Sequence, residues 1–171
     1  MNDYYVVGMG EALWDILPEG KKIGGAPANF AYHVSQFGFD GCAVSAVGDD
    51  ALGLEMIDAL SGKNVKHHIE KVSFPTGTVK IGLDNLGVPR YDIKEGVAWE
   101  NIPYTGDIES IAKQAKAVCF GSLAQRNGIS RATINRFLDA VGKECLVVFD
   151  ANLRQEYYSK EILEDSIKRC D

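Results

Sequence analysis

The chain has 171 residues, enough for one domain with its own core, and its 46% hydrophobic and 25% charged residues are typical of soluble globular proteins. A net charge of −6 argues against nucleic acid or an anionic membrane as the main partner. Since nothing near the N-terminus resembles a signal peptide and no apolar run reaches membrane-spanning length, we expect a cytoplasmic protein.

The four cysteines are consistent with a reducing compartment. None of them belongs to a C-x-x-C pair, so the usual spacing of zinc sites and dithiol redox centres is absent. We therefore expect reduced, buried thiols and no metal site.

A buried parallel strand is predicted at residues 4–9. The stretch that follows Gly8 resembles the dinucleotide fingerprint G-x-G-x-x-G. However, Leu13 replaces the third glycine, and Pro18 and Gly20 interrupt the helix that should come next. A nucleotide-binding oxidoreductase is therefore disfavoured.

The first strand ends at Gly10-Glu11, and Asp15 follows a few residues later. Ligands of open α/β sheets bind just beyond the carboxyl ends of the strands. A carboxylate at this position can accept hydrogen bonds from ligand hydroxyl groups. The alternative interpretation is an aspartate that only forms a turn.

The pair Gly24-Gly25 precedes a helix predicted at residues 27–37. Glycine permits positive φ and close approach of a ligand, and Pro27 suits the first turn of a helix. Asn29 lies near the free N–H groups and the positive end of the helix dipole. This arrangement can present donors to an oxygen-rich ligand, although an ordinary loop-to-helix junction has the same local pattern.

An antiparallel insertion is predicted at about residues 65–102. It contains two alternating strands and a turn, at residues 76–84, 88–94 and 85–87. A small sheet with one apolar face needs cover, which a lid over the site, a subunit contact or both would supply. Tyr91 and Trp99 are available there to contact a ligand or another subunit.

Strands and helices alternate through the rest of the chain. Further buried strands are predicted at residues 42–47, 117–122 and 145–150. Helices are predicted at residues 51–60, 107–114, 130–141 and 159–169. Asp50 and Ser130 are the expected N-caps of the first and third of these helices. This order predicts an α/β fold, a doubly wound sheet with helices on both faces.

Several polar or glycine-containing segments follow strands or begin helices: Asp15, Gly24-Gly25, Asn29, Gly121-Ser122 and Asp150 through Arg154. Because the carboxyl ends of parallel strands share one edge of the sheet, these segments should converge. Together their carboxylate, amide, N–H and guanidinium groups can recognise a polyhydroxylated ligand.

Three motifs resemble the PfkB (ribokinase-like) family of carbohydrate kinases, and the overall pattern is nearest to bacterial fructokinases. They are GGAPANFA at residues 24–31, VGDDALG at residues 47–53, and the D-x-N-x-R segment at residues 150–154. The resemblance covers essentially the whole chain. It implies a Rossmann-like domain with a β-sheet lid and ATP-dependent phosphorylation of a sugar hydroxyl, with fructose as the expected sugar.

The resemblance also implies sugar-binding residues and cofactors. The residues are Asp15, Gly24, Gly25, Asn29, Tyr91, Trp99 and Arg154. Acid-sugar kinases of the family often carry an arginine on the lid, whereas the nearest basic residue here is Lys94, which favours a neutral sugar. ATP and Mg²⁺ are the implied cofactors, and a homodimer through the lid is the implied assembly.

One family signature is not found in the chain. The glycine-rich D-T-x-G-A-G-D loop, which carries the catalytic base and an anion hole, does not occur before Asp171. We therefore expect residues 1–171 to be the sugar-binding, N-terminal part of such a kinase. No catalytic base is expected within these residues, which should be inactive alone. The alternative is a non-catalytic module that binds a sugar or a partner.

Overall fold

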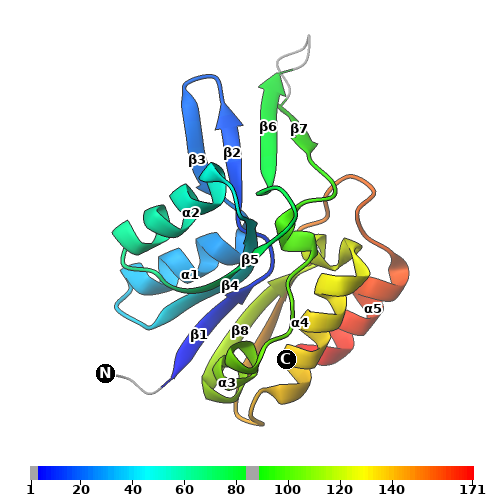
Figure 1. Ribbon diagram of the computed structural model, residues 1–171. Helices are drawn as coiled ribbons and strands as arrows, with labels where there is room; N and C mark the ends of the chain where they lie inside the picture. Colours follow the sequence, from blue (N-terminus) through cyan, green and yellow to red (C-terminus); the bar gives the residue numbers. More distant parts are fainter. Residues whose placement is uncertain (1–3, 84–88) are drawn as a thin grey trace.

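The computed structural model describes residues 4–83 and 89–171, which build two β-sheets (Figure 1). The central sheet is parallel, with the order β5-β4-β1-β8-β9. Its strands are β1 (Tyr5–Met9), β4 (Gly41–Gly48), β5 (Lys66–Val72), β8 (Ala115–Gly121) and β9 (Leu146–Asp150). The small sheet is mixed, with the order β3-β2-β6-β7. Its strands are β2 (Leu13–Leu17), β3 (Gly20–Gly24), β6 (Thr78–Leu83) and β7 (Pro89–Ile93).

Helices cover both faces of the central sheet (Figure 1). Those on one side are α1 (Ala26–Gln36) and α2 (Ala51–Gly62). Those on the other are α3 (Gly106–Gln114), α4 (Gly128–Ala140) and α5 (Lys160–Arg169). Short 3₁₀ turns occur at η1 (Ala98–Glu100) and η2 (Leu123–Arg126). This architecture confirms the predicted doubly wound α/β fold with a small additional sheet.

The alternation of side chains along β4 separates two hydrophobic cores. Val44 and Ala46 face a core that also contains Ile108 of α3 and Phe137 of α4. The neighbouring residues of the strand point the other way, toward a core formed with α1 and α2 that includes Met56. A strand buried on both faces needs apolar residues at successive positions, which explains the largely apolar sequence of β4; its buried Ser45 accepts a hydrogen bond from the Ala12 N–H at 3.1 Å.

The position of β1 determines where a ligand can enter. β1 lies between β4 and β8, and the chain continues outward from it first on the β4 side and later on the β8 side. In open α/β sheets, a crevice forms beyond the carboxyl ends of the strands at such a reversal of strand order. The small sheet rises above this edge of the central sheet (Figure 1).

The small sheet combines two separate parts of the chain, which differs from the predicted insertion at residues 65–102. β5 lies within those limits but pairs with β4 in the central sheet. β2 and β3 lie outside them but form half of the small sheet. The parallel pairing of β2 with β6 joins distant segments and has no local sequence signal. The predicted turn at 85–87 and the strand start at Val88 lie outside the described residues.

Ser130 does not cap α4 as predicted. The N-cap is Asn127, whose side chain accepts a hydrogen bond from the backbone N–H of Ile129. Ser130 is instead fully buried; its hydroxyl donates to the Trp99 carbonyl and accepts from the Ile102 N–H. A serine near a helix start serves either purpose, and only tertiary packing decides between them.

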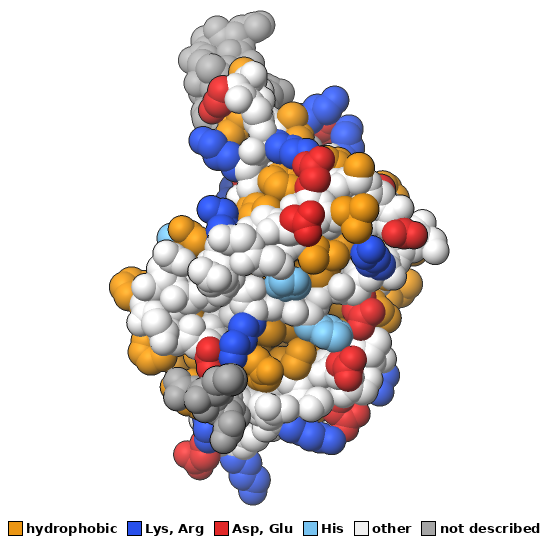
Figure 2. All heavy atoms as spheres, turned by 60° about the vertical axis from the view of Figure 1, so that its left-hand side comes forward, with side chains coloured by type: hydrophobic (Ala, Val, Ile, Leu, Met, Phe, Trp, Pro, Cys, Tyr) orange, Lys and Arg blue, Asp and Glu red, His pale blue; other side chains and the backbone are white. Residues whose placement is uncertain are grey.

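The face bearing α1 and α2 carries interspersed charged side chains of both signs (Figure 2).

All four cysteines are free thiols. Along the described part of the chain, no helix is both long and apolar enough to cross a bilayer.

Asp50 is the N-cap of α2, as predicted, and it also connects that helix to the segment entering β6. Its Oδ1 accepts hydrogen bonds from the Gly53 N–H at 2.8 Å and the Thr76 hydroxyl at 2.7 Å. Its Oδ2 accepts from the Thr76 N–H at 2.8 Å. Burial opposes ionisation, but these hydrogen bonds prevail, and the pKa of the Asp50 carboxyl lies below its usual value.

We expect Asp50→Ala to lower the free energy of unfolding by about 2 kcal/mol, from one lost cap and the lost contacts with Thr76. Because the folded-state pKa is depressed, this contribution is present above the unfolded pKa near 4 and is lost as pH falls below it. Urea unfolding at pH 7 and at pH 3 measures both effects. Asp49→Ala is the matched control, since the side chain of Asp49 is 81% exposed. Equal losses in the two variants would contradict the assignment.

Candidate functional site

A cavity of about 290 Å³ lies between the carboxyl edge of the central sheet and the small sheet. Its polar lining residues come from the ends of β1 and β9, from β2 and β7, and from the start of α1. The full lining consists of Glu11, Leu13, Asp15, Gly25, Ala26, Asn29, Val79, Ile81, Tyr91, Ile93, Leu123, Asn152 and Arg154. The cavity therefore has an apolar wall from β6 and β7 and polar groups on its other sides.

Asp15 lies in the middle of β2, opposite Lys22 of β3 and Val79 of β6. Burial raises the pKa of this half-buried carboxyl, although the positive charge of Arg154 opposes the shift. Gly24 lies directly against it: a Cβ at Gly24 would stand 2.3 Å from Oδ2 of Asp15. Gly24 thus makes room for the carboxylate, and it is not itself among the residues that line the cavity.

Gly25 connects β3 to α1 in a backbone conformation with φ of +100°. A Cβ here would stand 2.2 Å from the carbonyl oxygen of Glu11, so both the conformation and the close approach require glycine. The Gly25 carbonyl accepts the backbone N–H of Asn29 at 2.9 Å. This places exposed Asn29 in the first turn of α1, at the border of the cavity.

Arg154 lies in the loop after β9. This loop makes hydrogen bonds with β7 of the small sheet. Gln155 donates from Nε2 to the Tyr91 carbonyl at 2.6 Å, and the Tyr157 hydroxyl contacts the Ile93 carbonyl at 3.4 Å. The Arg154 guanidinium lies 5.4 Å from the centre of the Tyr91 ring, within the range of a cation–π contact. Tyr91 is 42% exposed at this position. The loop and the small sheet, which corresponds to the expected lid, therefore place a cation and an aromatic ring side by side at the cavity.

Glu11 is a cavity residue that the sequence motifs did not indicate. It follows Gly10 just beyond the end of β1, is only 3% exposed, and lines the cavity. Burial, the largest effect, raises the pKa of its carboxyl to about 7; nearby Asp150 adds to the rise, while two backbone N–H groups and Arg154 oppose it. A charged residue immediately after a buried strand was the sequence signal that could have identified it.

Trp99 is the predicted site residue that the fold places elsewhere. It is 1% exposed and belongs to the hydrophobic core, with the Arg126 guanidinium 4.5 Å from the centre of its ring. Its large apolar area is therefore buried beneath the base of the small sheet, where Gly77 leaves space for the indole. Ser122, also expected near the ligand, instead donates its hydroxyl to the Ala151 carbonyl at 2.7 Å.

Five of the predicted residues do line the cavity together. They are Asp15, Gly25, Asn29, Tyr91 and Arg154. They come from β2, the β3–α1 junction, α1, β7 and the loop after β9. The expected convergence is therefore confirmed for Asp15, Gly25, Asn29 and Arg154, whereas Gly24, Gly121 and Ser122 are not among the residues that line the cavity.

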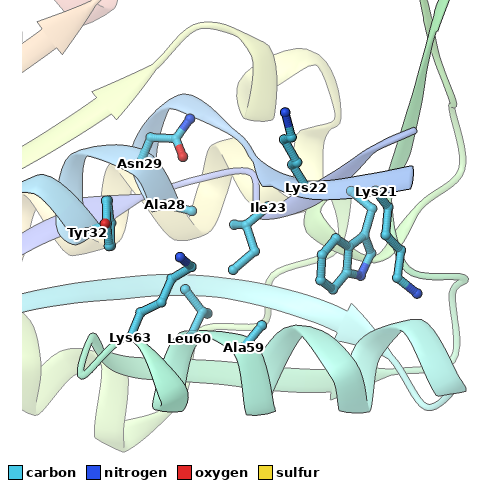
Figure 3. A pocket seen from close by; sticks show the side chains of 10 residues that line it. Lys21, Lys22, Ile23, Ala28, Asn29, Tyr32, Ala59, Leu60 and Lys63 are labelled. Carbon is cyan, nitrogen blue, oxygen red and sulfur yellow. The ribbon is translucent and has the colours of Figure 1, made fainter. Parts of the chain in front are cut away.

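A second hollow, of about 380 Å³, lies between α1, α2 and β3 (Figure 3). Lys63 extends into it from the end of α2, with its Nζ 5.1 Å from the centre of the Tyr32 ring. Ile23, Ala28 and Leu60 make its lining largely apolar, and it contains no carboxylate. It offers fewer acceptors for hydroxyl groups than the cavity at the strand ends.

The side chains that commonly bind metal ions are dispersed over the described part of the chain. Within residues 4–83 and 89–171, no group of three or more histidine, cysteine, aspartate or glutamate side chains is arranged to hold a metal ion. The polar groups of the cavity are suited to hydrogen bonding with a polyol rather than to enclosing a cation.

The sequence matches the pfkB family of carbohydrate kinases over residues 19–168. It is 33% identical over 159 residues to the uncharacterized sugar kinase PH1459 of Pyrococcus horikoshii, covering 88% of this chain and 51% of that protein. It is 27% identical over 166 residues to the ATP-dependent 6-phosphofructokinase of Thermoanaerobacterium thermosaccharolyticum, covering 87% of this chain and 50% of that protein. The chain thus spans about half the length of the curated relatives it matches.

Solved structures share the fold. The crystal structure of PH1459 has a TM-score of 0.84 at 29% identity and covers 98% of this chain and 63% of its own. PH1459 in complex with ATP gives a TM-score of 0.83 at 29% identity, with 98% and 61% coverage. Fructokinase from Xylella fastidiosa has a TM-score of 0.84 at 18% identity, with 100% and 58% coverage. At that identity the last likeness concerns the fold alone.

The close approach of Gly25 to Glu11 predicts an unusually large effect of one methyl group. Gly38→Ala, where φ is +82° and no atom lies within 4 Å of a Cβ, should cost about 1 kcal/mol of stability through backbone strain alone. Gly25→Ala combines strain with overlap against backbone and should cost at least about 1 kcal/mol more. Urea unfolding of both variants measures the difference, and equal costs would refute the close contact.

Proposed function

The chain belongs to the pfkB family of carbohydrate kinases, and we propose that it supplies the acceptor-binding part of an enzyme that phosphorylates a hydroxyl of a neutral sugar, with fructose as the first candidate. ATP is the proposed phosphoryl donor. Family membership favours this enzyme over the non-catalytic module that the sequence left open. We assign this substrate-binding role to residues 1–171 as a whole, including the lid.

The observation that carries the proposal is the composition of the cavity at the strand ends. Asp15 supplies acceptors for sugar hydroxyls, while Asn29 and Arg154 supply donors for sugar oxygens. Tyr91 supplies an apolar ring face beside them. Burial of a polar group is costly unless a partner is present, so a polyol that pairs with these groups gains both affinity and orientation.

The charge of the cavity supports a neutral sugar over an acidic or phosphorylated one. Arg154 is the single cation among the described lining residues, and it faces the carboxyls of Asp15 and Glu11. Lys94, which follows β7, is paired with Asp92 at 2.9 Å. A carboxylate or phosphate on the ligand would meet little uncompensated positive charge.

Nucleotide and Mg²⁺ binding are not assigned to the described residues. They contain neither a G-K-[ST] phosphate loop nor a carboxylate cluster of the kind that holds a cation. The roles proposed for this chain are therefore to bind the acceptor, to orient its hydroxyl and to exclude water beneath the lid.

Two further expectations remain proposals. The small sheet projects beyond the end of the central sheet (Figure 1), and we propose that it forms a homodimer contact through the lid. Sedimentation of the chain at several concentrations tests this contact. The four free thiols support a cytoplasmic location.

A coupled assay of the complete gene product with ATP, Mg²⁺ and a panel of sugars tests the function. Fructose should be phosphorylated, while fructose 6-phosphate and 2-keto-3-deoxygluconate should be poor acceptors. Failure to phosphorylate any hexose, pentose or nucleoside would refute the proposal. A preference for a phosphorylated or acidic sugar would refute the neutral-substrate argument alone.

We expect Asp15→Ala to raise the apparent KM for the sugar roughly 10- to 100-fold, corresponding to about 1.5–3 kcal/mol for a charged hydrogen-bonding group. Asn29→Ala should raise it in the same direction by a smaller factor, because the amide is neutral. The KM for ATP should change little in both variants. Steady-state kinetics with each substrate varied in turn provides the measurement.

Asp92→Ala is the matched control for Asp15→Ala, because Asp92 lies on β7 with a side chain that is 58% exposed and outside the cavity. Its sugar KM should remain within twofold of wild type. Unchanged sugar kinetics in both Asp15→Ala and Asn29→Ala would mean that the acceptor binds elsewhere.

A further inference from the structure

Glu11 carries a buried carboxyl group that the acceptor-binding roles described above do not use. The residue is 3% exposed and lines the cavity, and its Oε2 has no hydrogen-bond partner among the described residues. Leaving such an atom unpaired inside a protein is expensive, and native structures contain few examples. The unpaired Oε2 therefore indicates that the carboxyl of Glu11 has a role in the cavity that it lines.

Both the backbone and the side chain of Glu11 contact the junction that begins α1. Its carbonyl oxygen lies against Gly25, where no Cβ could be accommodated. Its carboxylate is stabilised by hydrogen bonds from its own N–H and from that of Ala26, the first residue of α1. The same turn carries Asn29 through the bond from the Asn29 N–H to the Gly25 carbonyl. A change at Glu11 therefore reaches a proposed sugar-binding group through the start of α1.

The charged groups around Glu11 act in opposite directions. Asp150 at the end of β9 disfavours its ionisation, and Arg154 from the following loop favours it. Asp15 lines the same cavity from β2. Cys119 on β8 is electrically neutral, because burial raises the pKa of its thiol to about 11. With burial as the largest effect, the pKa of Glu11 is about 7, so both of its protonation states are populated near neutral pH.

We propose that Glu11 is a positioning residue of the sugar cavity, and that its ionised form holds the start of α1 and Arg154 in the arrangement that binds the sugar. Uptake of one proton by Glu11 then weakens sugar binding. This inference rests on the proposed function of the cavity.

The direction follows from the contacts of the two protonation states. The ionised carboxylate accepts the Glu11 and Ala26 N–H groups at full strength and attracts Arg154 toward the cavity. The neutral acid accepts these hydrogen bonds more weakly and exerts no net charge on Arg154. Proton uptake therefore loosens both the turn that carries Asn29 and the arginine that faces the sugar.

Calorimetric titration of the complete gene product with fructose, at pH values from 6 to 8, tests the inference. If only the ionised form binds, the apparent Kd should rise about tenfold between pH 8 and pH 6, with the midpoint near pH 7. Glu11→Gln removes the charge while keeping the size of the side chain. Its binding at pH 8 should be at least as weak as that of the wild type at pH 6, and it should not depend on pH.

Glu11→Asp and Glu100→Gln complete the set of variants. Glu11→Asp keeps a titratable carboxyl and should retain a pH-dependent Kd. Glu100 is also buried, at 4% exposure, but it pairs with Arg126 at 2.5 Å outside the cavity. Its variant should lose stability yet retain the tenfold pH dependence, which separates general destabilisation from the effect at the cavity.

The outcomes distinguish the inference from the function on which it rests. Fructose binding that is independent of pH in the wild type would overturn the role of Glu11 and leave the sugar site intact. That role would also be overturned if Glu11→Gln weakened binding equally at every pH and kept the wild-type slope, since Glu11 would then be merely structural. Absence of binding of any sugar by the wild type would overturn both.

Discussion

The close contact between the first turn of α1 and the end of β1 is the constraint on which the site depends. Gly25, at φ of +100°, packs against the carbonyl oxygen of Glu11, and only glycine can occupy that position. This contact directs the N-terminus of α1 toward the cavity and determines where Asn29 lies. It also encloses the Glu11 carboxyl between the strand and the helix, away from water.

The position of the small sheet over the cavity is fixed by hydrogen bonds with the rest of the chain on two sides. Asp50 accepts hydrogen bonds from Thr76 where the chain enters β6, and Gln155 and Tyr157 contact the carbonyl groups of β7. Asp15 on β2 is thereby held opposite Arg154 from the loop after β9. The acceptor and the donor of the proposed sugar site thus come from segments that are far apart in the sequence.

The electrostatics of the cavity follow from unequal burial of its carboxyls. Glu11 is enclosed beyond the end of β1, whereas Asp15 is half-buried on β2 of the small sheet, and Arg154 is the cation that both carboxyls share. Two carboxyls with one cation disfavour anionic ligands and suit a ligand that offers hydroxyl groups. Burial, as the largest effect, raises the pKa of the Glu11 carboxyl to about 7, so its charge changes near neutral pH.

The sequence by itself determined the α/β class, most strands and helices, the N-cap at Asp50 and the family, because these depend on local apolar periodicity and on short motifs. It also indicated that Asp15 and Arg154 would converge, since parallel strands share a carboxyl edge. Only the tertiary structure decided that β2 joins β6, that Trp99 lies in the core, and that Glu11 lines the cavity. Strand pairing and burial join residues distant in the chain, so no local pattern records them.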